Sequence, residues 1–469
     1  MPLPFPLLRL PALLLGALAL SGCASIGPPG DADVAAINRL TQPHTGQPLA
    51  AEPLSPEALA ERLREPLGAD AAVQLALQNS RALQARLARL GVTAAEVDAA
   101  SRLPNPGFSF SRLRRGDEVE LERGWHISLA RLLTLPLVQR AEQRRLQAEQ
   151  QLAAADVLAL AADTRRAWVV AVAAEAALSY RRQVLEAGDA GAELAKRMQA
   201  AGNFNALAHA REQAFAADAR LGLARTESQR LAARERLVRL LGLSSVDAAA
   251  LQLPERLPEL PAAPRELADA ETLALSQRLD VQAARLRLEQ ASRQLEAGRI
   301  NRFVSMLELG VVRNSSNEAP TQRGWEVTLE LPLFGSGPLP RAQALAREAA
   351  YDAADTGIRA HSEVREAHGR YRGAFDIARQ HRDELLPLAQ RISQEQLLRY
   401  NAMLIGVFEL LADARSQVAA VAAAQDALRD FWLAQADLDQ TLLGRVTSSG
   451  SPALPQAGSA AAAPAAAAH

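Results

Sequence analysis

Two stretches of this chain alternate apolar with polar residues, whereas most of the remaining sequence carries the three- and four-residue spacing of helices. The first runs from Arg123 to Leu129 and the second from Arg323 to Leu331, and both open on Arg-Gly-Trp. A period of two is typical of a β-strand with one apolar and one polar face. The triplets lie 200 positions apart, and the same offset relates Arg165 to Arg365, Ala167 to Ala367, Arg182 to Arg382 and Leu185 to Leu385. This shared offset indicates a duplicated structural unit.

The first unit is predicted to span residues 69–253 and to combine long helices with one β-hairpin. Apolar residues at helical spacing predict a helix from Asp70 to about Arg102. Alternating stretches on either side of a Gly-Asp turn predict a hairpin over 107–132. Residues 137–242 then predict a helical hairpin of coiled-coil type.

The first helix of that hairpin is unusually long. It contains no proline after Pro136 and continues to about Ala201, a length of about 95 Å if the helix is unbroken. Gly188 and Gly191 are expected to bend it, and Gly202-Asn203 is expected to end it. A compact domain has no need of so long a rod.

The same order of elements restarts after a proline-rich linker at 254–264. The second unit covers 265–446, with a predicted helix at 266–300, a β-hairpin at 302–334 and a helical hairpin at 339–444. Pro387 is expected to kink the long helix, which turns near Gly406. The fold class is therefore mainly α with a small β part, arranged as two copies of one unit.

Both ends of the chain are predicted to lie outside this core. Residues 1–22 are typical of a signal peptide, because an apolar run too short to span a bilayer follows Arg9. Residues 23–68 are rich in Pro, Gly and Ala, which predicts an extended tether with one short helix near Pro56 to Arg64. The Ala- and Pro-rich tail at 447–469 is predicted to be disordered.

Cys23 is the only cysteine, so a disulfide within the chain is excluded. The sequence Leu20-Ser21-Gly22-Cys23 resembles the cleavage box of bacterial lipoproteins, which implies that Cys23 carries palmitate or a similar acyl chain. Ala24 replaces the Asp that commonly retains such proteins at the inner membrane, so the resemblance implies an anchor at the outer membrane. The alternative interpretation of Cys23 is a buried structural thiol.

Composition argues against several classes of function. The net charge of -1 leaves no basic field for nucleic acid. The seven histidines are scattered, and His361 and His368 are too far apart on a helix to chelate one ion. We therefore predict no enzymatic activity, no cofactor, no metal site and no nucleic-acid partner.

Four strands cannot enter a bilayer as an open sheet, because the edge strands would leave backbone groups unpaired. The smallest barrels need about eight strands, so the hairpins either lie on a soluble core or combine with those of other chains. In the second case the apolar strand residues face lipid, namely Trp125, Ile127, Leu129, Trp325, Val327 and Leu329. The polar residues between them face a water-filled lumen, namely His126, Ser128, Glu326, Thr328 and Glu330.

With these features the chain resembles the TolC family of bacterial outer-membrane efflux proteins, in its lipoprotein branch. The resemblance covers about residues 55 to 445. The features that support it are the duplicated unit, the strand that ends Leu331-Pro332-Leu333-Phe334-Gly335, and the turns near Ala201-Gly202-Asn203 and Arg399 to Met403. It implies a homotrimer with a 12-stranded β-barrel, continued across the periplasm by a 12-helix α-barrel.

The resemblance also implies a function. The implied function is that of an exit duct, which passively conducts substrates delivered by an inner-membrane pump through a periplasmic adaptor. The alternative from another class is a lipid-anchored periplasmic coiled-coil scaffold without a pore. Pump class and substrate, whether metal ion, drug or peptide, stay open.

The two helical turns are the expected docking end for the adaptor, because both rods start at the membrane and have similar lengths. Gly202 and Gly406 are expected to allow the tight reversals. The predicted docking residues are Gly202, Asn203, Phe204, Met403, Leu404, Ile405, Gly406 and Val407. By resemblance, Glu409 and Asp413 are candidates for the pore gate, although Met403 and Ala412 depart from the Gly and the acidic residue that the family often has there.

Overall fold

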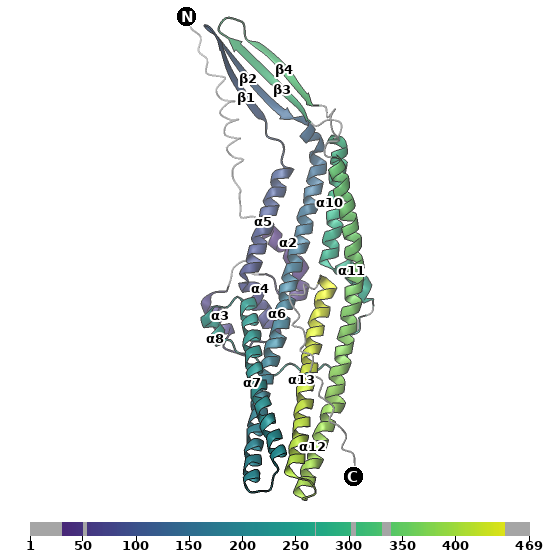
Figure 1. Ribbon diagram of the computed structural model, residues 1–469. Helices are drawn as coiled ribbons and strands as arrows, with labels where there is room; N and C mark the ends of the chain where they lie inside the picture. The colour runs from purple at the N-terminus through teal and green to yellow at the C-terminus, as the bar shows by residue number, and fades with distance from the viewer. Residues whose placement is uncertain (1–30, 50–53, 268, 302–305, 331–338, 446–469) are drawn as a thin grey trace.

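The computed structural model describes residues 31–49, 54–267, 269–301, 306–330 and 339–445. The predicted signal peptide, Cys23 and the tail at 447–469 lie outside the described residues. The molecule is a long rod of helices with a small sheet at one end and two helical turns at the other (Figure 1). The prediction of a mainly α-helical fold with a small β part is confirmed.

One four-stranded antiparallel sheet contains both predicted hairpins. Its strands, in spatial and chain order, are β1 (Gly107–Arg115), β2 (Glu118–Ser128), β3 (Met306–Ser316) and β4 (Gln322–Glu330). The two Arg-Gly-Trp triplets lie at the same level on either side of β3, because Trp125 pairs with Val311, which in turn pairs with Trp325. Within this one chain, β1 and β4 are edge strands.

The first hairpin is shorter than predicted. It ends at Ser128, and Leu129, expected in the strand, is the first residue of α6 (Leu129–Ala200). The Ser128 hydroxyl accepts a hydrogen bond from the backbone N–H of Arg131 at 3.4 Å and so caps this helix. Pro136, expected to precede the helix, lies inside it.

The rod of the first unit consists of α6, which is 72 residues and about 110 Å long, and the antiparallel α7 (Ala206–Leu241). Gly188 and Gly191 do not interrupt α6. Both are buried, and a Cβ atom at Gly188 would lie 3.2 Å from the ring of Phe215 in α7. These glycines therefore serve close helix packing rather than a helix break.

Each of the two helices predicted before a hairpin is a pair of helices. The first pair is α4 (Ala69–Asn79) and α5 (Arg81–Ser101), and the second is α9 (Ala270–Gln277) and α10 (Leu279–Asn301). Ser80 and Arg278 separate the members in extended conformations. Because both residue types occur readily inside helices, sequence pattern alone gives no signal for these breaks.

The second rod consists of α11 (Leu339–Gln380), a π-helical turn η2 (His381–Leu385), α12 (Leu386–Asn401) and the antiparallel α13 (Val407–Leu443). The expected irregularity at Pro387 takes the form of this π turn directly before it. Since proline has no N–H to donate, the preceding turn adopts a wider pattern in which the Leu386 N–H bonds to the His381 carbonyl.

The N-terminal segment is more structured than the predicted tether. Besides α3 (Pro56–Arg62), it contains α2 (Asp31–Thr45), which packs against α6. Ile37 of α2 is fully buried, and Leu63 and Leu67, which follow α3, are almost fully buried. These apolar side chains, although far apart in a Pro- and Gly-rich stretch, fix the segment on the rod. At the end of the first unit, α8 (Ser245–Ala250) precedes the proline-rich linker.

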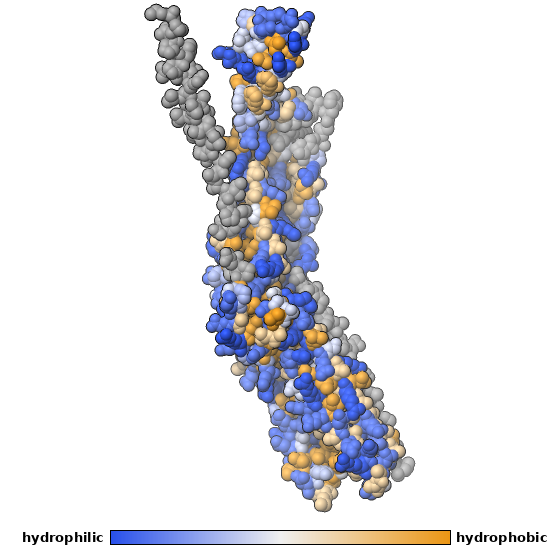
Figure 2. All heavy atoms as spheres, turned by 90° about the vertical axis from the view of Figure 1, so that its left-hand side faces the viewer, coloured by the Kyte–Doolittle hydropathy of each residue, from blue (hydrophilic) through white to orange (hydrophobic). Residues whose placement is uncertain are grey.

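Three apolar clusters hold the middle of the rod together. Two belong mainly to the first unit, around Trp168 and Val157, and one to the second, around Phe375. Trp168 donates its indole N–H to the Leu67 carbonyl at 2.7 Å, which fastens the segment before α4. On the face shown in Figure 2, hydrophobic and hydrophilic side chains are intermixed along the rod.

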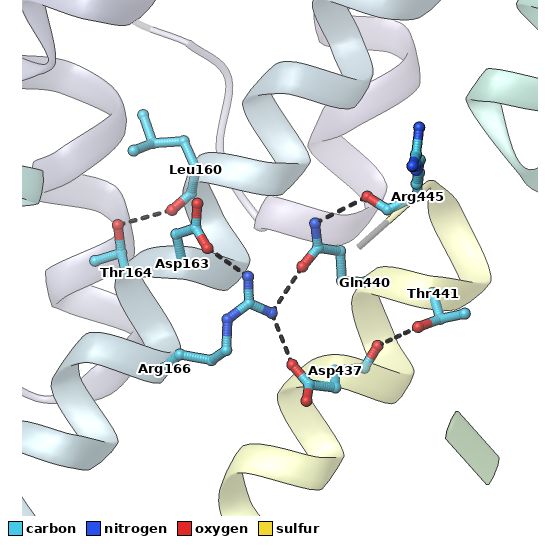
Figure 3. Close-up of polar contacts among 8 residues, drawn as sticks. All are labelled: Leu160, Asp163, Thr164, Arg166, Asp437, Gln440, Thr441 and Arg445. Atoms are coloured by element: carbon cyan, nitrogen blue, oxygen red, sulfur yellow. Dashed lines mark hydrogen bonds and ion pairs between the residues drawn. The ribbon is translucent and has the colours of Figure 1, made fainter. Parts of the chain in front are cut away.

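A polar network joins the two units where α6 lies beside α13. Arg166 donates to the Asp437 carboxylate at 2.9 Å and to the Gln440 side-chain oxygen at 2.7 Å, and it also pairs with Asp163 (Figure 3). Gln440 in turn donates to the Arg445 carbonyl at 3.2 Å. Because these groups satisfy one another, the network fixes the register of the two rods.

Candidate functional site: the sheet and the helical tip

The four strands have one largely apolar face, made of residues far apart in sequence. One row crosses all four strands, from Phe108 through Trp125 and Val311 to Trp325. Trp125 is 55% exposed and Trp325 is 76% exposed, and the Phe108 and Trp125 rings lie 4.9 Å apart. Such exposure of large apolar side chains marks a surface that contacts lipid or another protein.

The predicted apolar residues other than Leu129 lie on this face. Ile127 pairs with Leu309, which pairs with Val327, so a second apolar row lies beside the tryptophan row. Leu329 pairs with Leu307 in a third. The polar residues His126, Ser128, Glu326, Thr328 and Glu330 alternate with them and lie on the opposite face.

The turns 201–205 and 402–406 lie at the far end of the rod (Figure 1), and their backbones make matching hydrogen bonds. The left-handed residue is Gly202 in the first turn, with φ of 76°, and Met403 in the second, with φ of 60°. The N–H groups of both donate to the carbonyl three residues earlier at 2.9 Å. The expected role of Gly406 is therefore corrected, because its φ is -80° and it is the N-cap of α13.

The side chains of the tip divide into exposed and inward-facing groups. Met403 is 93% exposed and Leu404 is 74% exposed, whereas Ile405 and Val407 are half-buried. Phe204, predicted to lie on the docking surface, is half-buried and stacks on Phe408 with ring centres 3.9 Å apart. This stack joins the turn of one unit to the first residues of α13 in the other.

A buried ion pair adds a second link between the units near the tip. Arg415 of α13 pairs with Glu212 of α7, and its guanidinium also lies 4.2 Å from the centre of the Phe215 ring. The Glu212 side chain is only 7% exposed. Sequence reasoning missed both charged residues, because neither belongs to a recognisable motif.

The predicted gate residues differ in their exposure. Glu409 is exposed, and Asp413 is half-buried with one carboxylate oxygen that has no hydrogen-bond partner among the described residues.

Two groups on α6 have shifted pKa values. A hydrogen bond from Arg197 lowers the pKa of Glu193, and burial raises the pKa of Tyr180. The Tyr180 hydroxyl donates to the Val418 carbonyl at 2.6 Å, which ties α6 to α13.

The described residues do not bring three His, Cys, Asp or Glu side chains together in a group able to hold a metal ion. Across the same part of the chain, every helix lacks the long uncharged apolar stretch needed to cross a bilayer.

Comparisons with known proteins are informative at the level of three-dimensional structure. Protein-family models and curated proteins give no match to the chain. A solved membrane protein from Pseudomonas aeruginosa is similar at a TM-score of 0.67 and 22% identity, over 82% of this chain and 93% of that chain. The outer membrane protein VceC from Vibrio cholerae is similar at 0.67 and 17%, over 81% and 96%.

The open state of the MtrE outer membrane channel from Neisseria gonorrhoeae is similar at a TM-score of 0.64 and 19% identity, over 82% of this chain and 89% of that one. The chain thus has the fold of the TolC-family outer-membrane channels, as the sequence resemblance implied.

Proposed function

We propose that this chain is one subunit of an outer-membrane exit duct, anchored through a lipid on Cys23 and extending into the periplasm. Three copies form the duct, which passively conducts substrates supplied by an inner-membrane pump through a periplasmic adaptor. The solved structures of similar fold include proteins described as outer membrane channels, which supports this assignment.

The observation that carries the proposal is the division of the sheet into an apolar and a polar face at the end of a rod about 110 Å long. An apolar exterior and a polar interior are what a barrel in a bilayer requires. Because β1 and β4 are edge strands, each can pair with the edge of a neighbouring copy. Three copies then give 12 strands without a free edge, and the rods continue the wall.

A conductance measurement distinguishes this function from the alternative, a lipid-anchored scaffold without a pore. The purified chain is reconstituted in planar bilayers and the current is recorded, with Val327→Arg as a variant on the apolar face and Thr328→Arg on the polar face. Arginine on the lipid side costs about 2–4 kcal/mol at the midplane and less toward the headgroups, so Val327→Arg should reduce insertion, whereas Thr328→Arg should insert and alter the current. A protein that conducts neither unmodified nor with Arg415→Ala at the tip is a scaffold.

At the tip, we propose that contacts between the two units keep the duct narrow at rest. The ion pair of Glu212 with Arg415 and the stack of Phe204 on Phe408 both resist separation of the helical hairpins. Glu409 and Asp413 stay candidates for charges that line the opening. The pair is the sharper target, because removing Arg415 leaves a buried carboxylate without its partner.

Arg415→Ala should therefore raise the open probability of the reconstituted channel. Arg415 is 30% exposed, so the loss is about 2 kcal/mol, enough to shift the ratio of open to closed states about 30-fold. Arg429→Ala is the matched control, because Arg429 lies on the same helix and, among the described residues, pairs only with its neighbours Asp426 and Asp430. Equal currents from both variants would remove Arg415 from the closing contact.

We also propose that the exposed apolar turn binds the adaptor. Met403 and Leu404 are too exposed to stabilise the turn itself, so their apolar surface is available to a partner. Met403→Asp combined with Leu404→Asp should abolish crosslinking of the tip to the adaptor and stop efflux, while the protein still reaches the membrane. Val246→Asp is the control, because Val246 is 78% exposed on α8, away from the tip. Efflux by the double variant at the control level would contradict docking.

A further inference from the structure

Three arginines form a row on the apolar face of the sheet. Arg123 on β2 lies opposite Arg313 on β3, and Arg313 lies opposite Arg323 on β4. Neighbouring strands are about 4.8 Å apart, so the three backbones place these side chains side by side. All three are exposed. Like charges directly opposite one another destabilise a sheet, so this row needs an explanation.

The carboxylates of the sheet do not neutralise the row. All six Asp and Glu residues of the four described strands lie on the polar face, namely Glu118, Glu120, Glu122, Glu308, Glu326 and Glu330. Five of the six arginines in these strands lie on the apolar face, namely Arg112, Arg114, Arg123, Arg313 and Arg323. Among the described residues, Arg123, Arg313 and Arg323 have no ion pair with a carboxylate. The row therefore presents uncompensated positive charge on the same surface as the exposed tryptophans.

The row has a fixed position relative to those tryptophans. In each Arg-Gly-Trp triplet the arginine lies two residues from the tryptophan, about 6.7 Å along the strand and toward the free end of the sheet. Seen in Figure 2, this end carries both hydrophilic and hydrophobic side chains. Tryptophan rings on membrane strands lie at the level of the lipid headgroups. The arginines then lie at the depth of the headgroup phosphates.

We infer that Arg123, Arg313 and Arg323 form a binding site for the phosphate groups of a membrane lipid in the leaflet at the free end of the sheet. The site rests on the proposed function, because it requires the apolar face to lie in a bilayer. Guanidinium groups bind phosphate through two parallel hydrogen bonds, and they remain charged next to apolar surface. A bound phosphate also offsets the repulsion between the three arginines. The duplicated triplet thus supplies both an aromatic anchor and a phosphate ligand on β2 and on β4.

The test measures binding of a defined lipid to the full-length protein in detergent. The probe is lipid A with two phosphate groups, and the comparison probe is the same lipid without phosphates. The variant combines Arg123→Gln, Arg313→Gln and Arg323→Gln, which removes the charges but keeps polar side chains. Three basic residues near a phosphorylated surface account for roughly 100-fold in affinity, so the variant should bind lipid A about 100-fold more weakly.

The matched control removes the same charge from the rod, through Arg359→Gln, Arg370→Gln and Arg379→Gln in α11. These arginines pair within their own helix and should leave lipid binding unchanged. The inference is overturned if the sheet variant binds like the control, if lipid A without phosphates binds equally well, or if free inorganic phosphate competes at the concentration of lipid A. Bilayer conductance of the same preparations separates the two claims. Current without phosphate-dependent binding refutes the lipid site alone, whereas no current from either the unmodified protein or its Arg415→Ala variant refutes the duct.

Discussion

The two helical turns at the tip have one backbone conformation and two different sets of side chains. Ala201 to Asn205 in the first unit correspond to Ala402 to Gly406 in the second, with matching hydrogen bonds from both turns to the preceding helix. The first uses Gly202 in the left-handed position and the side chain of Asn205 as the N-cap of α7. The second has Met403 and Gly406 at these positions, and Gly406 offers no side-chain cap. The two turns thus follow the same path, and the first has the residues that favour it, a glycine in the left-handed position and a side-chain cap.

The two units also differ at the helix breaks before their hairpins. Ser80 in the first unit accepts the Leu83 N–H at 3.3 Å, an ordinary helix cap. Arg278 in the second is 1% exposed, binds both oxygens of Asp280 at 3.0 and 2.7 Å, and lies 2.7 Å from the Glu363 carboxylate of α11. A buried charge is tolerated only with such partners. The second unit therefore depends on buried ion pairs at this break, whereas the first depends on a serine side chain that caps the next helix.

The largest expected change in stability comes from substitutions at these two helix breaks. Arg278→Ala should lower the free energy of unfolding by about 3–5 kcal/mol, because Asp280 and Glu363 lose the buried partner they share. Ser80→Ala at the equivalent position should lower it by only about 1 kcal/mol. Denaturant titration of the detergent-solubilised protein, followed by helical circular dichroism, measures both. Arg285→Ala, at an exposed position on α10, is the control and should be nearly neutral. Similar losses at Ser80 and Arg278 would contradict the contrast between the units.

The sequence predicts regular features of this fold well and specific pairings poorly. Alternation around the two Arg-Gly-Trp triplets predicted the strands, and long runs with few Pro or Gly residues predicted the rods. The boundary at Leu129 was placed too late because apolar alternation continues across it while Ser128 already caps α6. Similarly, α2 lies in a Pro- and Gly-rich stretch and becomes stable by burying Ile37 against other helices.

The candidate sites show the same limit. Exposed apolar residues at the second turn could be predicted from composition, since Leu404 is unusual in a turn facing water. The left-handed conformation of Met403 could not, because only the shared geometry of the two turns imposes it. The Glu212 and Arg415 pair has no local signal, and the triplets mark Arg123 and Arg323 without showing that Arg313 lies between them. Both depend on the register between segments about 200 residues apart, which only the fold supplies.

Exchanging the left-handed residues should produce a smaller effect of predictable sign. A side chain with a Cβ costs about 1–2 kcal/mol in the left-handed region, whereas glycine adopts it freely. Gly202→Met should therefore lower the free energy of unfolding by about that amount, and Met403→Gly should raise it by somewhat less, because glycine also gains entropy in the unfolded chain. The double exchange should be nearly neutral. Open space within 4 Å of Gly202 excludes a clash as the cause. A loss of stability with Met403→Gly would show that the methionine side chain stabilises the turn.

The smallest expected effects concern the caps that follow. The Asn205 side chain accepts the Ala208 N–H at 2.7 Å, and Asn205→Ala should cost about 1 kcal/mol because this N–H loses its acceptor. Gly406 has the same extended backbone, with φ of -80° and ψ of 160°, so Gly406→Asn should place a side-chain oxygen at the start of α13 and add a few tenths of a kcal/mol. Hydrogen exchange in the first turns of α7 and α13 resolves changes of this size. Exchange should quicken in α7 of Asn205→Ala and slow in α13 of Gly406→Asn, with Gly406→Ala as the control that adds a side chain without an acceptor. Equal protection in the Asn and Ala variants would mean that the second turn gains from reduced flexibility rather than from a cap.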